Sequence, residues 1–302
     1  MKDWINFATV RDFAAEQTEA YRLCTKREAW VERYGPEVVI SYKNDGALES
    51  ILHELDEWSL LGGLQFERVF GRFLPKQNAE RNPPQLISGD PAAPLQRTVL
   101  ERAVCYALDF AAGYSVGLFL DQRENRSVVR RSAPRRLLNC FAYTCSFSVV
   151  AGLAGAETLS IDLSKKSLER GRDNFMLNRL ATDRHRFLSD DVMAVLPRLA
   201  RKGERYDFII LDPPTFSRSR AGRSWQVERD FEKLLSLALD VAEREATILL
   251  STNCTRLDER ALEVMSRFCL KAARRAGNFQ RPSPLPDFPP GAAARSLWLR
   301  LR

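Results

Sequence analysis

The sequence predicts an α/β protein with a mostly parallel sheet and helices on both of its faces, preceded by a smaller α+β domain. Five short apolar runs predict buried strands, at residues 137–141, 157–161, 185–188, 208–211 and 247–250. Amphipathic stretches predict helices between them, at residues 147–153, 164–180, 194–202 and 231–242. Strands that alternate with helices need crossover connections, which produce parallel pairing with helices on both faces.

The first part of the chain has a different pattern. Residues 10–19 and 48–61 predict helices, and residues 37–42 and 64–73 predict strands. A polar, proline-containing segment follows at residues 76–91, so we place a domain boundary near residue 95, giving domains 1–95 and 96–302. Two strands at 103–110 and 114–120, joined at residues 111–113, and a final edge strand at 295–301 complete the prediction.

Composition excludes several classes of protein. The 302 residues are 45% apolar and 28% charged, which is enough to build a core. The uncharged stretch at 110–120 is shorter than the roughly 20 residues of a membrane-spanning helix. The first residues, Met1-Lys2-Asp3-Trp4, do not resemble a secretory signal, so we expect a cytoplasmic protein.

Cysteine and histidine usage argues against a metal site. Six cysteines occur without a C-x-x-C pair, and the chain has only two histidines, so we expect no metal. Most of the thiols should be reduced core residues.

Positive charge is concentrated in the second part of the chain. Residues 1–120 carry 13 Lys and Arg against 17 Asp and Glu, whereas residues 121–302 carry 33 against 22. Arginines gather at residues 123–136, and Arg218, Arg220 and Arg223 follow a proline-rich turn. This distribution favours a polyanion as partner, although an arginine-rich surface can also be merely solvated.

The predicted strand ends carry candidate ligand groups. After the strand at 137–141, small and hydroxyl residues occupy the turn into a helix, where backbone N–H groups can face a ligand. Asp162 ends the next strand, where a carboxylate can accept both ribose hydroxyls, or can simply cap the helix that begins at Ser164. No G-x-G-x-x-G occurs, which argues against a dinucleotide cofactor.

Two further strand ends add to this pattern. Asp190 and Asp191 follow the strand at 185–188 and could bind an adenine amino group or cap a helix. The sequence Asp212-Pro213-Pro214-Thr215-Phe216 follows the strand at 208–211. Because proline has no N–H, we expect its carbonyls to be unpaired acceptors in a cleft, with Phe216 available for stacking on a base; the alternative is a plain turn.

In this order the segments resemble the class I S-adenosylmethionine-dependent methyltransferases, specifically the bacterial large-subunit ribosomal RNA enzymes of the RlmI type (5-methylcytosine) and the RlmKL 7-methylguanine domain. The resemblance covers roughly residues 100–302. It rests on residues 117–123, 138–144, 190–192 and 211–217 and on Asn174 and Asn178, four residues apart.

The resemblance implies a seven-stranded Rossmann-like sheet and S-adenosylmethionine as cofactor. It implies cofactor contacts by Gln122, Arg123, Phe141, Tyr143, Thr144, Ser146, Asp162, Leu163, Asp190, Asp191, Val192, Asp212 and Pro213. RNA contacts would come from Pro214, Phe216, Arg218, Arg220 and Arg223. We expect a monomer or a homodimer.

This chain departs from the family pattern at two places. Cys145 stands where the family usually has glycine, and its side chain could narrow the cofactor pocket or shift the turn. The first part of the chain is also short and acidic for the RNA-binding module of 5-methylcytosine enzymes. RNA binding would then depend on the basic second part.

The methylated atom is left open between two classes. Cys254 follows the strand at 247–250 between two polar residues, as expected of an exposed loop thiol. In the 5-methylcytosine enzymes that this chain resembles, a cysteine at this strand end attacks carbon 6 of cytosine, so Cys254 and Asp212 are the catalytic candidates. The residues after Asp212 are closer to the 7-methylguanine domain, in which a base nitrogen accepts the methyl group.

Other readings of the sequence remain. The chain could be a non-catalytic RNA-binding protein with a methyltransferase fold, in which Cys145 has blocked the pocket. A small-molecule methyltransferase and a nicotinamide-dependent oxidoreductase are less favoured.

Overall fold

A computed structural model describes residues 3–74, 82–218 and 224–302. The chain forms two compact units, residues 1–123 with 285–292 and residues 124–284 with 293–302. The division lies at residue 123, whereas the sequence pattern placed a boundary near residue 95. The chain also returns to the first unit at residues 285–292, a long-range event that no local pattern signals.

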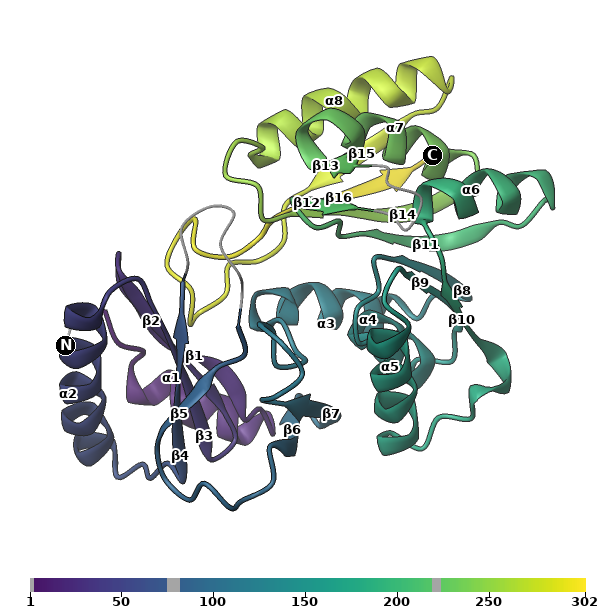
Figure 1. Cartoon of the computed structure of the whole chain (residues 1–302). Coiled ribbons are helices and arrows are strands. Elements are labelled where there is room, and N and C mark those ends of the chain that lie inside the picture. The colour runs from purple at the N-terminus through teal and green to yellow at the C-terminus, as the bar shows by residue number, and fades with distance from the viewer. Residues whose placement is uncertain (1–2, 75–81, 219–223) are drawn as a thin grey trace. The chain divides into compact units, whose positions relative to one another are not determined.

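The first unit is built on a five-stranded sheet in the order β1-β2-β3-β4-β5. Its elements are α1 (Phe7–Ala15), β1 (Ala20–Thr25), β2 (Ala29–Tyr34), β3 (Glu37–Tyr42), α2 (Asp45–Gly62), β4 (Arg68–Phe73) and β5 (Gln85–Ser88). Only β3 and β4 pair in parallel, and α2 connects them. Apolar side chains of α1 and α2 pack with Val38 and Ile40 of β3, which places both helices on one face of this sheet (Figure 1).

A separate hairpin follows, formed by β6 (Gln96–Glu101) and β7 (Val104–Asp109). The prediction of strands at 103–110 and 114–120 was therefore wrong for the second strand. The hairpin turns at Arg102 and Ala103, which both have positive φ, of 49° and 61°. Two-residue hairpin turns of this kind usually show Gly or Asn, so the sequence gives no local signal for it.

The second unit contains the predicted α/β sheet, with the strand order β10-β9-β8-β11-β14-β16-β15. Its strands are β8 (Arg136–Cys140), β9 (Glu157–Asp162), β10 (His185–Ser189), β11 (Tyr206–Leu211), β14 (Ala242–Thr252), β15 (Gly277–Gln280) and β16 (Arg295–Leu301). The first five are parallel, and β16 runs antiparallel to both of its neighbours. The 295–301 strand was predicted at the edge, but β15 is the edge strand and β16 lies inside the sheet.

Helices cover both faces of this sheet (Figure 1). They are α3 (Arg123–Ser132), α4 (Ser146–Leu153), α5 (Lys165–Leu177), α6 (Val192–Arg201), α7 (Val227–Leu239) and α8 (Glu259–Ala272). Apolar side chains of α6, α7 and α8 form one core with the sheet, and α4 and α5 pack on the opposite face against β8, β9 and β10. The short turns η1 (Leu120–Gln122) and η2 (Thr182–Arg184) and the hairpin β12 (Phe216–Arg218) and β13 (Ser224–Gln226) complete the described elements.

The parallel register brings the candidate residues to one edge of the sheet. Cys140 pairs with Leu211, and Leu211 pairs with Leu250. The segments that follow these three residues therefore leave the same edge side by side, where α/β proteins bind ligands. In the described parts of the chain, we find no helix long and apolar enough to cross a bilayer.

Candidate functional site

The turn after β8 is built from left-handed backbone without glycine. Phe141, Tyr143 and Cys145 have φ of 60°, 48° and 61°. Each such residue costs roughly 1–2 kcal/mol, so the surrounding contacts must hold the turn in place. Two hydrogen bonds do so directly. The Tyr143 N–H donates to Asp162 Oδ2 at 2.8 Å, and the fully buried Asn174 donates from Nδ2 to the Thr144 carbonyl at 2.9 Å.

Asp162 is positioned by backbone donors on both of its oxygens. Besides Tyr143, the Ser164 N–H donates to Oδ1 at 2.8 Å. Burial raises the pKa of Asp162, and the two N–H groups offset this only in part. Ser164 itself caps α5 by accepting from the Ser167 N–H, as predicted. The carboxylate is thus fixed in direction at the strand end, which suits an acceptor for ligand hydroxyls.

The Cys145 side chain faces α5. A Cβ built on the buried Gly171 would lie 2.5 Å from Cys145 Sγ, so the thiol occupies the space that this glycine leaves. Cys145 is fully buried, and burial raises the pKa of its thiol to about 12. The expected narrowing of the pocket by this side chain is therefore wrong, because the thiol packs between the turn and α5.

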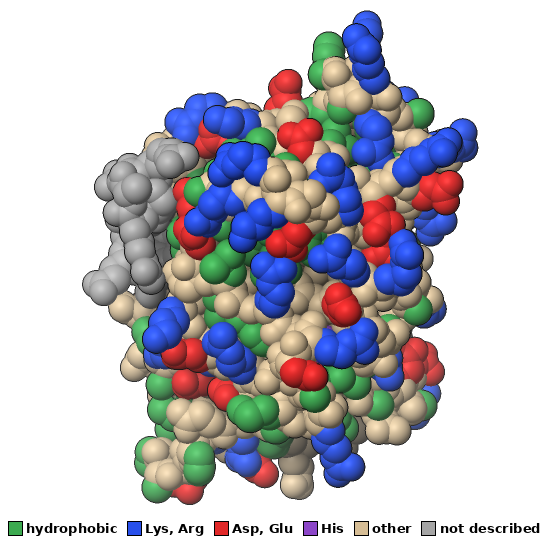
Figure 2. Space-filling model, turned by 90° about the vertical axis from the view of Figure 1, so that its right-hand side faces the viewer, with side chains coloured by type: hydrophobic (Ala, Val, Ile, Leu, Met, Phe, Trp, Pro, Cys, Tyr) green, Lys and Arg blue, Asp and Glu red, His purple; other side chains and the backbone are tan. Residues whose placement is uncertain are grey.

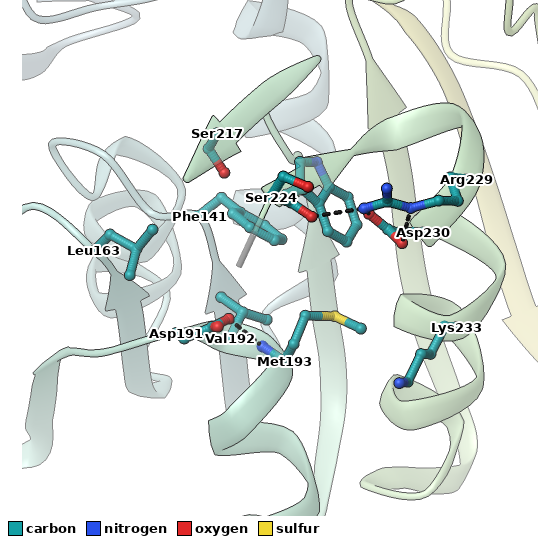
Figure 3. Close-up of a pocket in the computed structure, with 11 residues that line it drawn as sticks. Phe141, Leu163, Asp191, Val192, Met193, Ser217, Ser224, Arg229, Asp230 and Lys233 are labelled. Atoms are coloured by element: carbon teal, nitrogen blue, oxygen red, sulfur yellow. Dashed lines mark hydrogen bonds and ion pairs between the residues drawn. The ribbon is translucent and has the colours of Figure 1, made fainter. Parts of the chain in front are cut away.

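A cavity of about 180 Å³ lies at the same sheet edge (Figure 3). Phe141, Leu163, Asp191, Val192 and Met193 line one part of it, and residues of β12, β13 and α7 line the other. Asp191 caps α6 by accepting from the Met193 N–H at 2.9 Å, so the helix-cap reading is correct, and its carboxylate also lines the cavity. Asp190 forms an ion pair with Arg198.

Trp225 is one of several cavity-lining residues that the sequence did not reveal, together with Met193 and the lining residues of β12 and α7. It is buried, lines the cavity, and has its ring 5.6 Å from the ring of Phe141. Its Nε1 donates to the Pro214 carbonyl at 2.8 Å, so the expectation of an unpaired acceptor at Pro214 was wrong. A tryptophan eleven residues beyond Pro214 gives no local signal of this bond. Trp225 therefore connects the Asp212–Phe216 segment to the cavity.

The remaining predicted residues are placed as follows. Pro213 is buried, Asp212 and Ser146 are half-buried, and Pro214 and Phe216 are exposed, Phe216 by 52%. Arg218 belongs to β12, whereas Arg220 and Arg223 lie outside the described residues.

Two residues of the predicted set belong to the first unit. Gln122 and Arg123 are buried there, and Arg123 forms an ion pair with Asp287 through both of its terminal nitrogens. The guanidinium also lies over the Phe13 ring at 4.5 Å. These contacts give Arg123 a structural role in that unit.

Cys254 is buried, contrary to the expected exposed thiol. It is 4% exposed and belongs to the core formed with α6, α7 and α8. Its N–H donates to Thr252 Oγ1 at 3.1 Å, which turns the chain back toward the sheet directly after β14. The polar residues on either side of Cys254 predicted exposure wrongly, because this local turn buries Cys254 between them.

Similar proteins are methyltransferases. A family model described as S-adenosylmethionine-dependent methyltransferase matches residues 66–300. The ribosomal RNA large subunit methyltransferase I of Tolumonas auensis is 31% identical over 293 residues, which cover 90% of this chain and 71% of that protein. The protein of the same name from Aeromonas salmonicida is 34% identical over 197 residues, 64% of this chain and 49% of that one.

A solved structure described as a methyltransferase complexed with SAH has a TM-score of 0.84 and 25% identity, covering 97% of this chain and 78% of its own. This likeness extends over both units of the chain.

Proposed function

The chain belongs to the S-adenosylmethionine-dependent methyltransferases, and from this premise we propose that it methylates a base of ribosomal RNA, with carbon 5 of cytosine as acceptor and Cys254 as nucleophile. The observation that carries the proposal is that the cavity, the Asp212–Phe216 segment and the turn with Cys254 all lie beyond strand ends at one edge of the sheet. The names of the relatives support ribosomal RNA as substrate.

The residues present fit the cofactor. S-adenosylmethionine supplies an electrophilic methyl group on a sulfonium. The oriented Asp162 carboxylate would accept the ribose hydroxyls, and Asp191 would accept from the adenine amino group. Leu163 and Phe141 would pack on the purine, because they form the apolar lining beside Asp191.

The protein residues on the RNA side would hold and activate the base. Phe216, exposed beside the cavity lining, offers a ring for stacking on an extruded base. In the cytosine route, the Cys254 thiolate adds to carbon 6, which makes carbon 5 nucleophilic toward the methyl group. Loss of the carbon 5 proton to a base and elimination of the thiolate then restore the ring. Asp212, at the end of β11, is the candidate for that base.

Positive charge supports an RNA substrate. Lys and Arg side chains are spread over the face shown in Figure 2, with acidic side chains among them. The arginine run at 123–136 contributes less than its length implied, because Arg123 and Arg126 are buried. Arg130, Arg131 and Arg135 are exposed, and Arg135 is ion-paired with Glu243. Exposed arginines of this kind can contact RNA phosphates.

The burial of Cys254 favours a second candidate, methylation of a base nitrogen. A ring or exocyclic nitrogen has its own lone pair, so that route needs no thiolate and leaves Cys254 as a core residue.

The experiment is methylation of ribosomal RNA from a strain that lacks this gene, followed by mass spectrometry of nucleosides. Cys254→Ala is compared with Cys269→Ala, another buried cysteine of the same core. We expect 5-methylcytidine from the wild type and Cys269→Ala, none from Cys254→Ala, and equal cofactor affinity in all three. A methylated base nitrogen that persists in Cys254→Ala selects the second candidate.

A further inference from the structure

Both faces of the sheet in the first unit are buried, and they carry different kinds of side chains. One face packs on α1 and α2 through residues such as Val31, Val38 and Ile40. The alternate positions carry charged and aromatic side chains, among them Arg22, Glu32 and Arg72, which are nevertheless more than 90% buried. The second face of a largely antiparallel sheet usually faces water with ordinary polar residues. A buried charged and aromatic face therefore needs an explanation.

Glu32 fixes the two arginines of this face. Its Oε1 accepts from Arg22 at 2.9 Å and its Oε2 accepts from Arg72 at 2.7 Å. Arg72 also donates to Ser41 Oγ from Nε. Because both ends of the network are held, the guanidinium planes have defined positions.

Aromatic rings lie against both guanidinium groups. Arg22 lies 4.2 Å from the Phe288 ring centroid and 5.3 Å from that of Trp30. Arg72 lies 5.0 Å from the ring of Tyr114. Planar cations and rings in contact form the kind of surface on which unpaired bases stack in RNA-binding sheets.

A cleft of about 150 Å³ opens among these side chains. Apolar protein cavities of about this volume bind benzene, so the space suits one six-membered ring. The charged residues of its lining are Arg22, Arg72, Glu32 and Asp121, two positive and two negative groups. Without an excess of positive charge, the cleft suits an uncharged ring better than a phosphate.

Two buried donors of the lining add a preference for hydrogen-bond acceptors. Arg22 Nε and Trp30 Nε1 have no acceptor in the described part of the chain. A buried donor without an acceptor loses its hydrogen bonds to water without replacing them, which favours a ligand that offers an acceptor. Carbonyl oxygens and ring nitrogens of a base edge would satisfy such donors after a small side-chain movement.

We propose that this cleft binds one unpaired nucleobase of the RNA substrate, by stacking on its rings and guanidinium planes. The proposal rests on the RNA part of the proposed function. It gives the first unit a role in substrate recognition that its acidic composition does not suggest, since stacking needs no net positive charge.

The test uses the full chain and a short fluorescein-labelled single-stranded RNA, with binding followed by anisotropy at several salt concentrations. Phe119→Ala removes a cleft ring that is 43% exposed. Phe73→Ala is the matched control, since this ring is 52% exposed and its strand neighbour Arg72 faces the cleft. Successive strand residues point to opposite faces, which places Phe73 on the other side of the sheet.

We expect Phe119→Ala to weaken RNA binding about 5- to 150-fold, the range for one lost base–ring stack of about 1–3 kcal/mol. The salt dependence of binding should not change, because no phosphate contact is removed. Phe73→Ala should bind like the wild type, and cofactor affinity should be equal in all three proteins. Equal RNA affinity of the two variants overturns the cleft proposal alone, whereas a wild type that binds no RNA overturns the proposed function as well.

Discussion

Substitutions at Cys145 and Gly171, made singly and together, test how the turn after β8 is held. In Gly171→Ala the new Cβ would lie 2.5 Å from Cys145 Sγ and 3.1 Å from its Cβ. Both residues are buried, so the chain must shift, and overpacking of this kind costs about 1–3 kcal/mol. Cys145→Gly removes the thiol and also a side chain at φ 61°, where relief of about 1–2 kcal/mol opposes the lost packing.

The double variant should recover most of the stability lost in Gly171→Ala, because the glycine at position 145 leaves room for the alanine methyl. We expect a coupling of about 1–3 kcal/mol between the two sites. Urea unfolding of the four proteins, followed by far-UV circular dichroism, measures it, and calorimetry with S-adenosylmethionine reports whether the turn keeps its shape. If Gly171→Ala destabilises the Cys145→Gly protein as much as the wild type, the thiol does not fill this space.

Two further outcomes follow from buried polar contacts. Trp225→Phe keeps a ring in the cavity but removes the donor to the Pro214 carbonyl, so we expect methylation to fall about tenfold, as for a lost buried hydrogen bond of about 1–2 kcal/mol. Trp298→Phe, another buried tryptophan whose N–H is bonded, is the control, and equal losses in both variants would remove the special role of Trp225. Glu32→Gln leaves Arg22 and Arg72 without their carboxylate and should destabilise the protein by about 3–5 kcal/mol at pH 7. Burial raises the pKa of Glu32, but the two guanidiniums outweigh burial and hold it below its ordinary value. The stabilisation is therefore present above the unfolded-state pKa and disappears as pH falls through the lowered folded-state pKa. Unfolding at a series of pH values should show the difference between Glu32→Gln and the wild type shrinking in acid, and a constant difference would contradict this origin.

The second unit could be predicted from the sequence because its strands are short apolar runs between amphipathic helices. The elements of the first unit were harder to predict from the sequence. Strands β1 and β2 were missed, since Arg22, Glu32 and the aromatic residues between them hide the usual alternation. The second face of this sheet is buried through ion pairs, and such pairs depend on partners far apart in the chain.

The site residues that could be predicted are the acidic residues that directly follow a strand, because their position is set by the end of that strand. Asp162 and Asp191 follow strands directly, and the structure places Asp191 on the cavity and fixes Asp162 beside it. Trp225 and the burial of Cys254 could not be predicted in this way. Both depend on contacts made after the chain has turned back, from β13 to Pro214 and from Cys254 to Thr252.

The missing G-x-G-x-x-G motif argued against a dinucleotide cofactor, but it did not predict the backbone conformation of the turn after β8. Three left-handed residues, Phe141, Tyr143 and Cys145, together cost about 3–6 kcal/mol. Glycine would avoid this cost, but it would also leave the turn more flexible before binding. Here Asn174 and Asp162 hold the turn by hydrogen bonds. Gly171 leaves space for the thiol of Cys145, the last of the three left-handed residues. Hydrogen bonds and the space that Gly171 leaves in α5 thus take the place of the glycines that such turns usually carry, so contacts within the protein itself fix the shape of this turn.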